Sequence, residues 1–261
     1  MPSVRPPAPP PSRPHWWTDV HRSPAANLRL GVSLSFIAGA TNAGGFLAVG
    51  QYTSHMTGLL SAVADHLVLG QLALVAASLA AIGAFVGGAM TTALMVNWGL
   101  RRQLRSAFAR PLALETSLLL VFGLFGAAIN LHAELFAPLT VLLLCYIMGL
   151  QNAVITKVSN AEIRTTHVTG LVTDIGIELG KLVYLNRSPL PSRVVANRRK
   201  LRIHLALVAA FFVGGVLGAL GFKFWGYVTT LPLAALLGLL IAGPLLHDLR
   251  HGRIAPPAHP G

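Results

Sequence analysis

Six long apolar stretches constrain the fold of this chain more than any other feature of its sequence. Each is long enough to cross a bilayer, since a spanning helix takes roughly 20 residues at about 1.5 Å rise per residue. Lipid offers no partner to a free backbone N–H or C=O, so only helices and closed barrels can span it. The stretches are continuous rather than alternating in polarity, which indicates helices. They lie near residues 30–50, 71–97, 111–131, 135–156, 203–222 and 227–247.

The composition supports a membrane protein. Hydrophobic residues make up 54% of the chain and charged residues 11%, whereas soluble domains carry about 25% charged residues. The first 27 residues are rich in proline, so we expect a disordered tail there, a single membrane domain over 28–248 and a second tail over 249–261. The lipid bilayer is the first partner that the sequence predicts.

The positions of the charges predict the orientation in the membrane. A net charge of +12 would also suit a nucleic-acid-binding protein, but six apolar spans cannot be exposed to water, so we expect no nucleic-acid partner. The basic residues cluster at 5–29, 101–110, 157–202 and 250–253, and six spans place these segments on one side. Lys223 is the only basic residue in the connections of the other side. The positive-inside rule then makes both termini cytoplasmic.

A motif occurs twice, about 110 residues apart. Residues 53–58 read Thr-Ser-His-Met-Thr-Gly and residues 165–170 read Thr-Thr-His-Val-Thr-Gly, each after a Gly-x-x-Asn-Ala element. Weaker matches follow in the same order, such as Phe-Val-Gly-Gly at 85–88 and again at 212–215. A repeat unit of three spans reverses the side of entry, so the chain is expected to hold two inverted three-helix repeats, at 28–131 and 135–248.

Each motif precedes a segment too short to span, at residues 59–70 and 171–183. Two arrangements remain open for these segments. They lie along opposite membrane surfaces as interfacial helices, or they dip inward as half-helices that bring the two motifs together near mid-membrane.

These motifs resemble a known family. Asn-Ala-x-Gly-Phe-Leu at 42–47, Gly-Leu-Gln-Asn-Ala at 149–153, and Arg-Thr-Thr-His-Val-Thr-Gly at 164–170 are similar to the YoaK-type family of bacterial multi-pass membrane proteins, a domain of unknown function. The resemblance covers roughly residues 28–248. It implies a location in the bacterial inner membrane and implies no activity.

His55 and His167 are the first candidates for a functional site. Histidine titrates near neutral pH, and an ionisable group at membrane depth is costly and usually functional. Each would then contact a solute or carry a proton. The alternative is a local role in a tight turn at a helix start.

The residues after each histidine resemble helix starts. Thr57, Gly58, Thr169 and Gly170 could offer free N–H groups and a positive dipole end to an anion, or the threonines could simply cap their helices.

Three amide side chains lie inside predicted spans. Asn42, Gln151 and Asn152 would either orient a solute or bond to a neighbouring helix, because a buried amide needs partners.

Acidic residues are few. Asp174 and Glu178 share one face of a predicted helix and are weak candidates for ion coupling; the alternative is a solvated face paired with Lys181. We expect Glu115 to lie near the membrane surface and to be paired there, since Arg110 is five residues away.

Three classes of function follow. The first is a secondary transporter or permease of a small solute, with helix ends that favour an anion, at the interface of the repeats. The alternative is a non-transporting scaffold or sensor with a basic cytoplasmic face. An enzyme is not expected, since no H-E-x-x-H, P-loop or Gly-x-Ser-x-Gly motif occurs. Cys145 is the single cysteine, so an intrachain disulfide and a cysteine-based metal site are not expected. We also expect no other metal and no cofactor. The spacings Gly83-x-x-x-Gly87 and Gly214-x-x-x-Gly218 favour tight helix packing and would allow a homo-oligomer.

Overall fold

The computed structural model describes residues 16–20, 23–131, 133–159, 165–186 and 193–251. In these ranges the regular elements are all helical, as predicted. They are α1 (Pro24–Val49), α2 (Met56–Val68), α3 (Leu72–Arg101), α4 (Ala109–Leu131), α5 (Ala133–Val158), α6 (Val168–Val183), α7 (Arg198–Trp225), the 3₁₀ turn η1 (Gly226–Thr229) and α8 (Thr230–His251).

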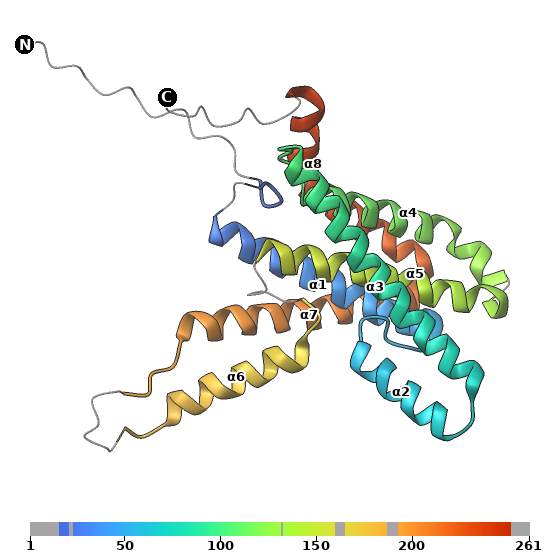
Figure 1. Cartoon of the computed structure of the whole chain (residues 1–261), viewed down its shortest axis with the longest axis horizontal. Coiled ribbons are helices and arrows are strands. Elements are labelled where there is room, and N and C mark those ends of the chain that lie inside the picture. Colours follow the sequence, from blue (N-terminus) through green and yellow to red (C-terminus); the bar gives the residue numbers. More distant parts are fainter. Residues whose placement is uncertain (1–15, 21–22, 132, 160–164, 187–192, 252–261) are drawn as a thin grey trace, which may run out of the picture.

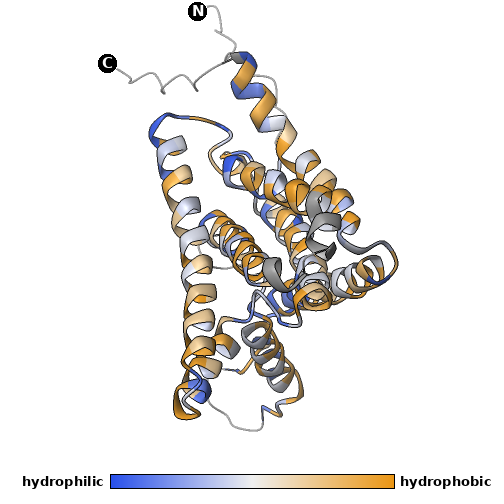
Figure 2. Cartoon of the chain, turned by 90° about the vertical axis from the view of Figure 1, so that its right-hand side faces the viewer, coloured by the Kyte–Doolittle hydropathy of each residue, from blue (hydrophilic) through white to orange (hydrophobic). Residues whose placement is uncertain are grey.

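The described part of the chain contains four segments long and apolar enough to cross a membrane. They are Ala25–Val49, Leu72–Arg101, Ala137–Val158 and Arg198–Arg250, of which the last runs through α7, η1 and α8. Hydrophobic residues line the bodies of the helices (Figure 2). The prediction of a helical membrane protein is therefore confirmed at this level.

The helices pack in matching pairs. α7 lies along α1 and α3 lies along α5, while α2 leans on α3 and α6 leans on α7. α6 with the beginning of α7, and α2 with the beginning of α3, project from the rest of the helices (Figure 1). α4 packs against α8. If α1, α2, α3 and α4 are matched with α5, α6, α7 and α8, each of these contacts corresponds to another contact in the set, and the α4–α8 contact corresponds to itself.

Glycines allow the helix backbones to approach closely at the α1–α7 and α3–α5 interfaces. A Cβ atom on Gly39 of α1 would lie 2.0 Å from the carbonyl oxygen of Phe211 in α7, and one on Gly214 would lie 2.0 Å from that of Phe36. The α3–α5 interface repeats this geometry. Cβ atoms on Gly149 and Gly88 would lie 2.0 Å and 2.1 Å from the carbonyl oxygens of Phe85 and Tyr146, respectively.

These contacts correct the register predicted for the repeat. They make Phe85 equivalent to Phe211 and Gly88 equivalent to Gly214, one residue earlier than the match of 85–88 with 212–215. The tight helix packing predicted for Gly83 and Gly87 is also wrong within the chain. A Cβ at Gly83 meets nothing within 4 Å, and one at Gly87 makes only ordinary contact at 3.8 Å.

The segment before α1 is more ordered than predicted. Of the predicted tail 1–27, residues 1–15 and 21–22 lie outside the described residues, but Thr18 is buried and its hydroxyl donates to the carbonyl of Leu240 in α8 (3.0 Å). Asp19 is buried and accepts from Nε of Arg105 in the α3–α4 connection (2.9 Å). A buried ion pair therefore joins this segment to the bundle.

Candidate functional site

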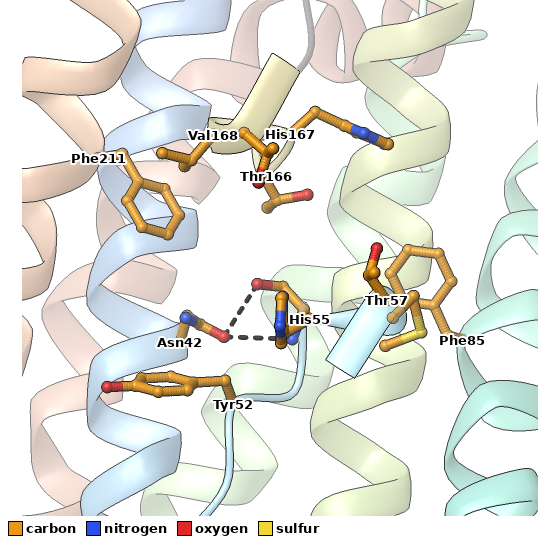
Figure 3. A pocket seen from close by; sticks show the side chains of 12 residues that line it. Asn42, Tyr52, His55, Thr57, Phe85, Thr166, His167, Val168 and Phe211 are labelled. Atoms are coloured by element: carbon orange, nitrogen blue, oxygen red, sulfur yellow. Dashed lines mark hydrogen bonds between the residues drawn. The ribbon is translucent and has the colours of Figure 1, made fainter. Parts of the chain in front are cut away.

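A cavity of about 680 Å³ lies where α2 and α6 begin. Both copies of the repeated motif line it, and Figure 3 shows the two sets of side chains facing each other across it. Its walls come from α1, α3 and α7 as well. The lining residues are Asn42, Tyr52, Ser54, His55, Met56, Thr57, Phe85, Thr166, His167, Val168, Thr169 and Phe211.

The lining follows the repeat almost position by position. His55 corresponds to His167, Thr57 to Thr169, and Ser54 to Thr166. Sequence reasoning missed Phe85 and Phe211, which form matching aromatic walls from α3 and α7. The one-residue error in the predicted register hid this pair.

Two helix starts point at the cavity. His55 and His167 occupy the N-cap positions of α2 and α6, and neither side chain makes a capping hydrogen bond. The first backbone N–H groups bonded within these helices are those of Leu59 and Leu171, which donate to the carbonyls of the two histidines. The amides before them lack an acceptor within their helix, as at any helix start.

The alternative in which the threonines cap their helices is therefore wrong. Thr57 and Thr169 stand at the second position inside their helices, because each helix begins one residue after the histidine. Both threonines are exposed on the cavity wall.

The two histidines sit differently on their helices. The ring of His55 folds over Gly58, since a Cβ there would lie 2.2 Å from Cδ2 of the imidazole. A Cβ on Gly170 would meet nothing within 4 Å. The local geometry therefore breaks the symmetry of the repeat at this point.

Asparagines fix both motifs to the preceding helix. Oδ1 of Asn42 accepts from the backbone N–H (3.1 Å) and the hydroxyl (2.9 Å) of Ser54. Oδ1 of Asn152 accepts from the hydroxyl of Thr166 (2.6 Å), and its amide donates to the carbonyl of Met148 (2.8 Å). The bonds to the two Oδ1 atoms come from the residues directly before the histidines, so the asparagines position the two helix starts.

Not every predicted site residue reaches the cavity. Asn42 lines it, whereas Asn152 is buried beside it and Gln151 points elsewhere. The amide of Gln151 donates to the carbonyl of Leu34 in α1 (3.2 Å), which is the helix-to-helix alternative. Gly58 and Gly170 lie in the first turns without forming the wall.

Asp174 and Glu178 also lie away from the cavity, where they join α6 to α7. Asp174 pairs with Lys200 (3.1 Å) and lies 3.7 Å from Nδ1 of His204. Glu178 pairs with Lys181 (2.8 Å) and accepts from the backbone N–H of Asn197, the N-cap of α7 (2.6 Å). These carboxylates hold the two helices together.

Acidification is expected to loosen the α6–α7 pair. The hydrogen bond from Lys181, and after it the one from the Asn197 amide, lower the pKa of Glu178. The ionised carboxylate therefore stabilises the fold fully above the unfolded pKa of about 4.3. This stabilisation is lost as the pH falls through the folded pKa. Hydrogen exchange at Asn197, corrected for its intrinsic rate, should rise at acid pH in the wild type and already at neutral pH in E178Q. The control is D174N, which removes a half-exposed ion pair and should leave the exchange rate near that of the wild type. Equal exchange in E178Q and wild type at neutral pH would contradict the role of Glu178 in holding α6 to α7.

The long apolar helices define a helical membrane protein. The chain belongs to the family described as Protein of unknown function (DUF1275), whose model matches residues 30–243. This match agrees with the resemblance to the YoaK-type family. No curated protein and no solved structure matches the chain.

Proposed function

We propose that this protein is a secondary transporter of a small anionic solute. In this proposal six helices span the bacterial inner membrane as two inverted repeats of three, both termini are cytoplasmic, and α2 and α6 are half-helices that enter from opposite faces. No chemical step is assigned to the protein.

One observation carries the proposal: both copies of the motif line a single cavity. Interfacial helices on opposite surfaces would lie a full membrane core apart and could not share a wall, since the core is about 30 Å thick. A site formed by two inverted elements can be reached from each side in turn when the repeats move against each other. The shared cavity therefore favours transport over a scaffold, which needs no such site.

The cavity walls suggest the chemistry of the solute. Two helix starts supply N–H groups that have no acceptor within their own helices, together with positive dipole ends, and both favour an anion. His55 and His167 add imidazole rings, whose N–H groups can donate hydrogen bonds to an anion. Phe85 and Phe211 are apolar, so the walls also suit a solute that carries an apolar part beside its charged group.

Cysteine accessibility tests the proposal without knowledge of the solute. Cys145 is the only native cysteine and is buried, so C145A provides a background in which T57C and T169C can be labelled one at a time. A membrane-impermeant maleimide, applied to oriented proteoliposomes from either face, should label both positions from both faces. L217C, which is half exposed on the apolar body of α7, is the lipid-facing control and should stay unlabelled.

The outcomes separate the two functions. Labelling from one face only, under all conditions, would contradict alternating access, and an absence of labelling at both positions would favour the scaffold. Inorganic phosphate, sulfate and short-chain carboxylates serve as probes in a second step. Protection of T57C and T169C by the same anion is expected, whereas protection of neither by any of these anions would contradict an anionic solute.

A further inference from the structure

Glu115 is a carboxyl group that the proposed solute site does not use. It lies in α4, is 0% exposed, and neither of its oxygens has a hydrogen-bond partner in the described part of the chain. The predicted pairing near the membrane surface is wrong, since Nε of Arg110 donates to the hydroxyl of Ser106 instead (3.2 Å). The chain therefore holds an unpartnered carboxyl group inside its helix bundle.

The face of α4 that carries Glu115 points into the main core. Leu112 and Leu119 lie three residues before and four residues after it, and so share its side of the helix. Both leucines are fully buried in one cluster with Leu34 of α1 and Met148 of α5. The carboxyl group therefore lies in the core cluster to which α1, α4, α5 and α8 contribute.

Gln151 of α5 brings a second unpartnered oxygen to this core. Its NH₂ group donates to the carbonyl of Leu34, which fixes the orientation of the amide and leaves Oε1 buried without a partner. α4 and α5 pack against each other as consecutive helices on either side of residue 132. Glu115 lies 17 residues before that position and Gln151 lies 19 after it, so both residues stand about five helical turns from the junction of the two helices.

The chemistry of these atoms permits one kind of pairing. An ionised carboxylate and an amide oxygen are both acceptors, and a bare charge in the core would cost several kcal/mol. A protonated carboxyl has one O–H donor, which satisfies the amide oxygen and removes the charge. We propose that Glu115 is a proton-binding site, and that in this packing its carboxyl group donates a hydrogen bond to Oε1 of Gln151.

No neighbouring cation offsets a charge on Glu115. The elements packed against α4 are α3, α5, α8 and η1, and Glu115 forms no ion pair with their described residues. The titratable side chains of these elements, and of α1, which shares the core cluster, have other neighbours. Tyr146 bonds to Thr91, Lys157 bonds to Asn97, and Arg29 of α1 lies over Trp17. Cys145 packs with Leu59 and Ala81, and the ring of Tyr227 packs on Phe122. His247 and Asp248 contact each other and Arg105, and Arg101, Arg250 and His251 lie at the ends of α3 and α8.

The site links proton binding to helix packing. A conformation that admits water to the core would let Glu115 ionise, so high pH favours that conformation and low pH favours the closed packing. This inference rests on α4 and α5 alone and holds whether or not the protein transports a solute.

Infrared spectroscopy of the full-length protein in phosphatidylcholine vesicles tests the proton directly. A protonated carboxylic acid gives a carbonyl-stretch band that a carboxylate lacks. At neutral pH the wild type should show this band and E115Q should lose it. The matched control is E178Q, because Glu178 is also buried but is paired with Lys181, and the band should remain in this variant.

Two further measurements complete the test. Glutamate labelled with ¹³C should move the band in the wild type, which keeps the assignment testable even if E115Q fails to fold. Q151L should shift the band to higher frequency, because the O–H group loses its acceptor. An absent band, or a band unmoved by ¹³C-glutamate, would overturn the proton site, while an unshifted band in Q151L would overturn the pairing with Gln151.

Discussion

Replacing Gly149 with alanine should prevent α5 from packing against α3. The new Cβ would lie 2.0 Å from the carbonyl oxygen of Phe85 and 2.8 Å from its carbonyl carbon. A backbone carbonyl inside a helix cannot rotate away, so the two helices must separate. The loss of stability caused by G149A should reach the upper end of the range for overpacking, about 3 kcal/mol. Helices in lipid associate largely through close packing, which this variant removes.

The measurement is the melting temperature and the monodisperse fraction after extraction into mild detergent. G149A should lose most of the monodisperse protein, and G39A should do the same through the equivalent contact between α1 and α7. G83A is the matched control on α3: its Cβ meets nothing within 4 Å, and alanine favours the helix by up to about 1 kcal/mol. A G149A protein that elutes and melts like G83A would contradict the close approach.

Apolar length and helical continuity made the fold class predictable. Most helix bounds fell within a few residues of the predicted stretches because the bilayer demands long apolar runs. The position of the tight glycines was not predictable in α3. Gly83, Gly87 and Gly88 look alike in sequence, and only the rotation of α3 against α5 decides that Gly88 makes the close contact.

The duplication made half of the site predictable. His55, His167 and their threonines line the cavity because the motif places them directly at the helix starts. Phe85 and Phe211 come from helices distant in sequence, and the shared apolar composition of membrane segments blurred their equivalence. Gln151 looked like its neighbour Asn152, but one residue along a helix turns a side chain by about 100°, and this rotation directs it to Leu34 instead of the motif.

The ion pair between Asp19 and Arg105 could not be predicted from the sequence, because it depends on tertiary structure alone. Asp19 precedes α1 in a stretch that resembles a disordered tail, and Arg105 belongs to a basic cluster that resembles a solvated loop. In the structure the Arg105 side chain contacts Asp19, while its backbone N–H and that of Ser106 donate to the carboxylate of Asp248 in α8 (3.3 and 2.9 Å). One short loop thus joins the segment before α1 to α8.

Arg105→Gln should accordingly destabilise the protein by about 3–5 kcal/mol, because it breaks a buried ion pair by removing one partner. R101Q is the matched control, since Arg101 is an exposed arginine four residues earlier and its loss should cost less than about 1 kcal/mol. The double variant R105Q/D19N removes both charges and should recover part of the loss, as a broken pair costs more than an absent one. Melting of the four proteins in the same detergent gives the comparison. If R105Q melts at the same temperature as R101Q, the Arg105–Asp19 ion pair contributes little to stability. The segment before α1 is then held by the contacts of Thr18 and its neighbours instead.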